Sequence, residues 1–154
     1  FMTGVQLSNN LGVDIIPAAA GWIFGLFWLC CVAIGIATEG GQGKLGGLAM
    51  KSQFLINLIV AIGMGGVAAA SFAGMADMPS WLAIKWLAYA VIAIAAIVLE
   101  RTFAPAVMLY GKLGEEGSSD ELNKNLHEAL QPVYRAVLVI YAATLVAGIT
   151  GLIH

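Results

Sequence analysis

Charged residues are scarce in this chain. Only 10% of its 154 residues are Asp, Glu, Lys or Arg, whereas 60% are hydrophobic. Soluble domains carry about 25% charged residues, so this chain has too few charges to coat a water-exposed globule, and we expect lipid to cover much of its surface. The formal net charge of −2 provides no basic surface and excludes nucleic acid as an expected partner.

Histidine and cysteine, the usual soft metal ligands, are also few. His127 and His154 lie about 40 Å apart on one straight helix, so they cannot hold one metal ion together. Cys30 and Cys31 are adjacent and point about 100° apart on a helix, which is poor geometry for a disulfide; we interpret them as apolar core residues. HExxH, CxxC and GxxxxGK[ST] motifs are absent. We therefore predict no metal, no cofactor and no catalytic residues.

Four long apolar runs are what the chain does contain. They cover approximately residues 15–38, 52–76, 81–110 and 130–153, and each is long enough to cross a bilayer as a helix. We predict an all-α polytopic integral membrane protein, a bundle of four transmembrane helices forming a single membrane domain over residues 1–154.

The segments between these runs are predicted from composition. Residues 1–14 are polar, lack the basic region of a signal peptide and are expected to be an exposed tail or surface turn. Residues 39–51 contain five glycines and two lysines and are predicted to be a loop. Residues 111–129 form the predicted second loop, with a short amphipathic helix that starts at a capping box from Ser118 to Glu121.

Small residues recur at a spacing of four in these runs. This pattern allows the backbones of two transmembrane helices to approach closely. We predict helix-packing roles for Gly21, Gly25, Gly66, Ala70, Gly74, Ala147 and Gly151. Near the start of the third run, Trp81, Trp86 and Tyr89 are predicted to lie at the membrane interface as an aromatic belt.

Four polar side chains form a candidate intramembrane cluster: Asn57, Glu100, Arg101 and Arg135. Charges in a membrane helix are expensive and usually face protein or water. We predict that Glu100 pairs with Arg135 across the third and fourth helices, that Arg101 reaches lipid phosphate or Glu128, and that Asn57 hydrogen-bonds a neighbouring helix. The alternative is a proton or substrate relay through Asn57, Glu100 and Arg135.

Basic residues predict the orientation. With four spans, one side of the membrane holds six basic residues, namely Lys44, Lys51, Arg101, Lys112, Lys124 and Arg135, and the other side holds only Lys85. Because cytoplasmic loops are enriched in Lys and Arg, we predict that the first side is cytoplasmic and that both termini lie outside, in a bacterial-type inner membrane.

Two segments resemble known families. GWIFGLFWL, residues 21–29, and AIKWLAYAVIAI, residues 83–94, resemble the first and third helices of CopD-like and HemJ-like four-helix membrane proteins, as does the order of spans. The resemblance implies a four-helix membrane fold, with redox or metal-linked activity. The HemJ-like haem-ligand positions hold Ile15 here in place of one histidine, and Ala96 with apolar neighbours in place of the other.

The sequence thus favours a non-catalytic integral membrane subunit or scaffold of a larger complex. Its expected partners are the lipid bilayer, with bound lipids, and other membrane subunits or further copies of itself. The alternatives are a small transporter or ion- or proton-handling protein, and a HemJ-like or CopD-like redox or metal-linked protein.

Overall fold

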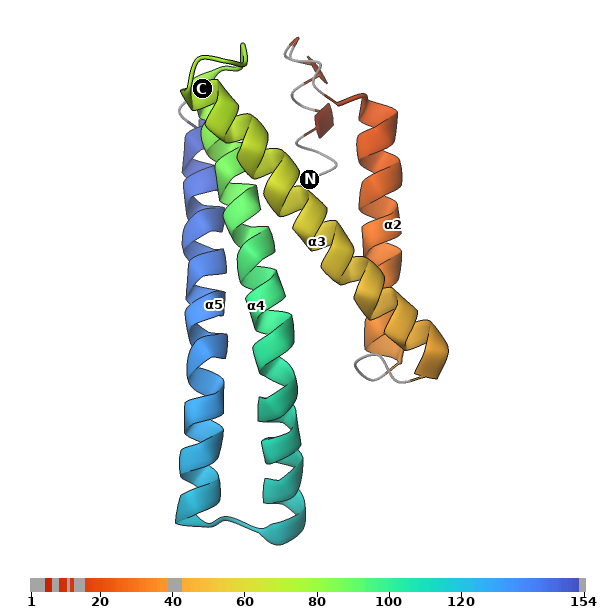
Figure 1. The fold of residues 1–154 in the computed structure, drawn as a ribbon, viewed down its shortest axis with the longest axis vertical. Coiled ribbons are helices and arrows are strands. Elements are labelled where there is room, and N and C mark those ends of the chain that lie inside the picture. The colour runs from red at the N-terminus through yellow and green to blue at the C-terminus, as the bar shows by residue number, and fades with distance from the viewer. Residues whose placement is uncertain (1–4, 7–8, 11, 13–15, 39–42, 153–154) are drawn as a thin grey trace. The chain divides into compact units, whose positions relative to one another are not determined.

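Four long helices form the chain in a computed structural model that describes residues 5–6, 9–10, 12, 16–38 and 43–152. They are α2 (Ala18–Ala37), α3 (Gly43–Phe72), α4 (Ser80–Glu116) and α5 (Asp120–Leu152) (Figure 1). Each is long and apolar enough to cross a membrane, and the described residues include no strand. The predicted all-α, multi-pass, four-helix membrane fold is confirmed.

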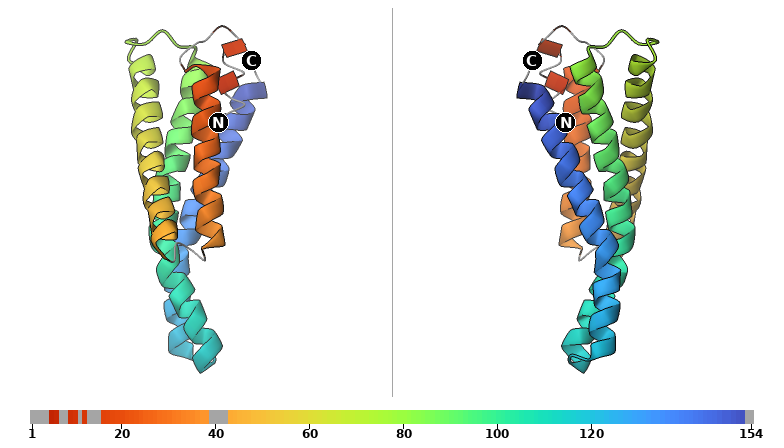
Figure 2. Two further views of the ribbon diagram at one scale, coloured as in Figure 1. Left: turned by 90° about the vertical axis from the view of Figure 1, so that its right-hand side faces the viewer. Right: turned by 90° about the vertical axis from the view of Figure 1, so that its left-hand side faces the viewer.

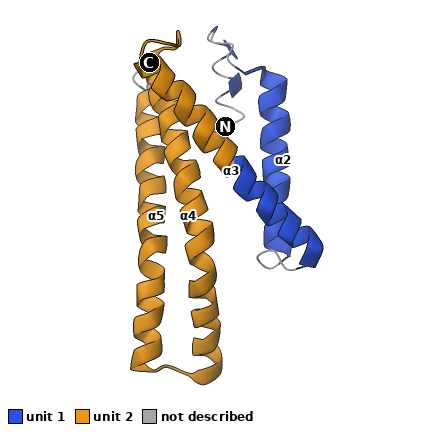
Figure 3. Ribbon diagram, in the orientation of Figure 1, with its two compact units in different colours: residues 1–56 blue, residues 57–154 orange. Residues whose placement is uncertain are grey.

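The helices belong to two compact units, residues 1–56 and 57–154 (Figure 3). The boundary falls inside α3, between Ile56 and Asn57. The first unit contains α2 and the beginning of α3, and the second contains the rest of α3 with α4 and α5. The four members of the predicted polar cluster all belong to the second unit, and the prediction of one membrane domain stays a prediction.

In the first unit, α2 begins directly after Pro17, whose φ of −55° and ψ of 136° lead into the helix. Gly21 and Gly25 are buried, and their predicted packing against another helix stays a prediction. A Cβ atom on Gly21 would lie 2.9 Å from Cγ1 of Val5, so Gly21 makes room for the segment that precedes α2. Cys31 is buried as predicted, but the prediction for Cys30 was wrong because its side chain is exposed.

The Gly-rich loop predicted over residues 39–51 is mostly helical. Helix α3 already begins at Gly43, and residues 39–42 lie outside the described part of the chain. Glycine within a helix costs only about 1 kcal/mol relative to alanine, and apolar residues among these glycines continue the span. One of them, Ala49, is buried. Composition alone therefore overstated the length of this loop.

Helix α3 ends in a Schellman motif that contains Gly74. The Met75 N–H donates to the Ala70 carbonyl at 2.9 Å, and the Gly74 N–H donates to the Ser71 carbonyl at 3.0 Å. This pattern needs a left-handed residue at the position of Gly74, which has a φ of +72°. The prediction that Gly74 packs against another helix was wrong, because its role is to end α3.

Helices α4 and α5 form a long antiparallel hairpin and lie side by side in Figure 1 and in both views of Figure 2. Both helices run through an internal proline, Pro105 in α4 and Pro132 in α5, as predicted for α5. Helix α4 extends to Glu116, so residues 111–116 are helical and the predicted loop shortens to a turn over residues 117–119.

The start of α5 is capped one residue later than predicted. The Oγ atom of Ser119 accepts a hydrogen bond from the Leu122 N–H at 3.2 Å, which is the contact an N-cap residue makes with the third helical residue. Ser118 instead accepts a bond from the Asn123 side chain at 2.9 Å. The predicted capping box from Ser118 to Glu121 is therefore replaced by a simple cap at Ser119.

Alanines form the contact between α4 and α5. Ala88 of α4 packs with Ala143 and Ala147 of α5 in one buried cluster, so the predicted packing role of Ala147 is confirmed. Small side chains on both helices let the backbones approach closely. Trp86 is also buried, with an exposed fraction of 9%, so its side chain packs inside the protein, and its predicted depth at the membrane interface stays a prediction.

Candidate functional site

One hydrogen bond joins two polar residues inside the membrane spans of the second unit. Asn57 of α3 is buried, with an exposed fraction of 6%, and its Nδ2 atom donates to Oε1 of Glu100 of α4 at 3.2 Å. The prediction that Asn57 bonds a neighbouring helix is confirmed. The acceptor is the carboxyl group of Glu100, and in its ionised form such a bond is charge-assisted and stronger than a bond between neutral groups.

The register of α3 against α4 explains this contact. A Cβ atom on Gly65, eight residues after Asn57, would lie 3.3 Å from the Cβ of Ala90, ten residues before Glu100. The two helices are therefore antiparallel, and Gly65 allows their close approach. Because Gly65 has no side chain, α3 and α4 can lie close enough for Asn57 to reach the carboxyl group of Glu100.

Arg135 lies in a different environment from Glu100. It lines a pocket with Ala95 and Val98 of α4, and within the described residues it has neither an ion pair nor a hydrogen bond. Glu100 follows Val98 by two residues, which places it about 200° further around α4. The predicted pairing of Glu100 with Arg135 is therefore not formed, because the two residues lie on different sides of α4.

The structure thus brings together two of the four predicted cluster residues. Asn57 and Glu100 form the contact, and Arg135 lies apart from them in the pocket. Arg101, the neighbour of Glu100, is exposed and makes its own interactions. Its predicted reach to lipid phosphate or Glu128 stays a prediction.

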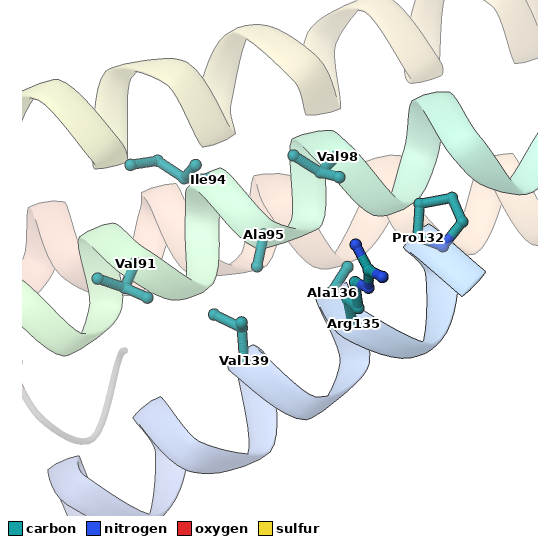
Figure 4. A pocket seen from close by; sticks show the side chains of 8 residues that line it. All are labelled: Val91, Ile94, Ala95, Val98, Pro132, Arg135, Ala136 and Val139. Carbon is teal, nitrogen blue, oxygen red and sulfur yellow. The ribbon is translucent and has the colours of Figure 1, made fainter. Parts of the chain in front are cut away.

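The pocket beside Arg135 has a volume of about 430 Å³ and lies between α4 and α5 (Figure 4). Its walls are apolar except for Arg135. Helix α4 contributes Val91, Ile94, Ala95 and Val98, and α5 contributes Pro132, Arg135, Ala136 and Val139. Three of the lining residues are exposed on the protein surface, with exposed fractions of 53% for Ile94, 42% for Val98 and 43% for Val139.

A basic side chain also lies near the end of the hairpin where α4 begins and α5 ends. The Lys85 ammonium is 5.3 Å from the centre of the Trp81 ring, within the range of a cation–π contact. A Cβ atom on Gly151 would lie 2.6 Å from Lys85 Nζ. Gly151 therefore has a packing role as predicted, but the group that it accommodates is the end of the Lys85 side chain.

The small residues predicted along α3 do not face one neighbour. Gly66 is exposed, and a Cβ atom added there or on Gly63 would meet no atom within 4 Å among the described residues. Ala70 is half-buried. Among the described residues of the second unit Gly66 therefore has no packing neighbour, and the packed side of α3 carries Gly65 and the fully buried Ala68 instead; the predicted helix-packing role of Gly66 stays a prediction.

Metal-binding side chains are dispersed in the part of the chain that the structure describes. No group of three or more His, Cys, Asp or Glu side chains gathers there. His127 is exposed on α5, and His154 lies outside the described residues. Comparison of the chain with protein-family models, curated proteins and solved structures found no match. The resemblance to CopD-like and HemJ-like proteins therefore stays an expectation from the sequence.

Proposed function

We propose that this chain is a non-catalytic integral membrane subunit or scaffold of a larger membrane protein complex. The observation that supports the proposal is the small-residue face of α3 around Gly63 and Gly66, next to which the other described residues of the second unit leave space. Such faces are where transmembrane helices associate, because backbone-to-backbone contact replaces the missing hydrophobic driving force. The chain would sit in a bacterial-type inner membrane with both termini outside.

Purification in mild detergent, followed by mass spectrometry of co-purifying chains, tests this proposal. Gly66→Leu should remove the co-purifying chain, because the added side chain fills the space that the partner helix needs. Ala104→Leu is the matched control, since Ala104 is also an exposed small residue in a membrane helix, on α4. The proposal fails if no chain co-purifies, or if Gly66→Leu retains every partner.

Cross-linking identifies what covers this face. Gly66→Cys in a background without Cys30 and Cys31, labelled with a thiol-reactive photo-cross-linker, should form a cross-linked product heavier than one chain. A cross-link to another helix of the same chain, identified by peptide mapping, would instead mean that this helix covers Gly66, which contradicts the proposal.

An ion- or proton-handling protein is the second candidate. The bond from buried Asn57 to Glu100 favours it, because ionisable groups inside membrane spans often mark proton or ion pathways. Proton flux into liposomes containing the purified chain provides the test. Flux that Glu100→Gln abolishes in a variant that still folds, as judged by circular dichroism, would support this candidate, and absence of flux in the unaltered chain would reject it.

A further inference from the structure

We propose that the pocket between α4 and α5 binds an anionic phospholipid, with the Arg135 guanidinium on the phosphate and one acyl chain against the apolar walls. The pocket volume of about 430 Å³ falls within the range of about 300–1,000 Å³ that small-molecule sites occupy. This inference is independent of whether the chain is a subunit of a complex.

The chemistry of the pocket matches the two parts of such a lipid. Arg135 is the one charged residue among the lining residues, and it is exposed. Within the described part of the chain, Arg135 lacks an ion pair or hydrogen bond. A planar guanidinium binds phosphate oxygens through paired, charge-assisted hydrogen bonds. Every other lining side chain is apolar and suits a hydrocarbon chain.

The direction of the pocket also fits a lipid in a bilayer. Arg135 and Pro132 lie at one end, and Val91 and Val139 lie at the other (Figure 4). The stretch from Val98 to Val91 covers about 10 Å of helix and runs away from the charged pair Glu100–Arg101 toward the middle of the uncharged part of α4. A headgroup at Arg135 would therefore place its acyl chain deeper in the membrane.

The openness of the walls favours a lipid over a buried cofactor. Ile94, Val98 and Val139 are each about half exposed, so the pocket opens sideways onto the surroundings of the hairpin. Where a hairpin of this kind crosses a membrane, acyl chains have access to an opening on its outer face. A phospholipid can enter such a pocket from the bilayer without any movement of α4 or α5.

Native mass spectrometry of the full chain in detergent, titrated with phosphatidylglycerol, tests the proposal. One phosphatidylglycerol should be retained more tightly than phosphatidylcholine, whose headgroup has no net charge. Arg135→Gln should weaken phosphatidylglycerol binding roughly ten- to hundredfold, the range expected for loss of hydrogen bonds to a charged group. Arg135→Lys should lose less, because the charge remains.

Two further variants separate the pocket from general electrostatic attraction. Lys124→Gln removes the same charge from an exposed position on α5 outside the pocket and should leave binding unchanged. Val139→Phe fills the acyl-chain end of the pocket from a half-exposed wall and should weaken binding while Arg135 is intact. Circular dichroism and size-exclusion chromatography of each variant identify any loss of folding.

Three results would overturn the proposal. The first is equal retention of phosphatidylglycerol and phosphatidylcholine. The second is equal loss with Lys124→Gln and Arg135→Gln, which would mean nonspecific attraction. The third is a fatty acid that binds more tightly than phosphatidylglycerol, which would assign the pocket to a free carboxylate ligand. If Arg135→Gln does not fold, unchanged binding by Val139→Phe alone refutes the proposal.

Discussion

The hydrogen bond from Asn57 to Glu100 predicts a measurable energetic coupling between α3 and α4. A hydrogen bond to a charged group contributes about 1.5–3 kcal/mol in proteins, whereas side-chain bonds between membrane helices average about 0.6 kcal/mol and reach about 1.7 kcal/mol. The Asn57 amide is buried but Glu100 is only half-buried. We therefore expect a coupling free energy of about 1–2 kcal/mol.

A double-mutant cycle on the free energy of unfolding in mixed micelles measures this coupling. Asn57→Leu and Glu100→Leu each remove one partner and should each destabilise the protein, because each leaves a buried or half-buried polar group without its bond. The double variant should be more stable than the sum of the two changes predicts, by the coupling energy. Glu100→Gln, which keeps an acceptor but removes the charge, should retain part of the coupling to Asn57.

Two controls isolate the contact. Thr102 follows Glu100 closely on α4, but its hydroxyl donates to the Val98 carbonyl of its own helix at 2.9 Å; Thr102→Val should therefore show no coupling to Asn57→Leu. Arg135→Leu combined with Glu100→Leu should also be additive, because Arg135 lies on another side of α4. Additive free-energy changes for the Asn57 and Glu100 variants, or coupling of Glu100 to Arg135 instead, would contradict the assigned hydrogen bond.

Three further predictions test the fold, the orientation and the cofactor content. Gly74→Ala should destabilise the protein by about 1–2 kcal/mol, since a Cβ atom is strained at a φ of +72°. The control Gly111→Ala, within α4 and with open space beside it, should not destabilise it. Equal losses of stability for the two variants in thermal unfolding would contradict the role of Gly74 in ending α3. Ser118→Cys, without Cys30 and Cys31, should resist impermeant thiol reagents added outside intact cells, and labelling there would reverse the orientation. Purified protein should show no Soret band, because the HemJ-like ligand positions lack histidine; a stoichiometric band would disprove this.

The sequence predicted the helices well and their ends less well, for a physical reason. The number of membrane helices follows from apolar length, which a bilayer fixes at about 20 residues. Helix ends instead depend on single hydrogen bonds. Ser118 and Ser119 are equivalent in composition, yet Ser119 is the residue whose Oγ accepts the Leu122 N–H. Likewise, composition does not reveal that α3 starts at Gly43.

Repeats of small residues in the sequence did not show which face of α3 packs against α4. Gly66, Ala70 and Gly74 share a spacing of four, yet Gly74 ends the helix through its positive φ and Gly66 is exposed. The neighbouring Gly65 packs against Ala90, one residue out of the predicted stripe. A spacing of four identifies a common face, but only the partner helix decides whether that face is the packed one.

The pairing of Glu100 with Arg135 was predicted wrongly because the prediction used only the positions of the two residues along their helices. It did not consider on which side of its helix each residue lies. Both residues lie near the middle of the α4–α5 hairpin, because α4 runs on from Glu100 to Glu116 and α5 already begins at Asp120, and opposite charges at one depth suggest a bridge. Whether two such residues can pair depends on the side of the helix on which each lies. The side of α4 that carries Val98 lines the pocket with Arg135, whereas Glu100 accepts a hydrogen bond from Asn57 on another side. Helix α4 therefore carries the contact with Asn57 on one side and the pocket with Arg135 on another, and we expect a substitution in one of them to leave the other intact.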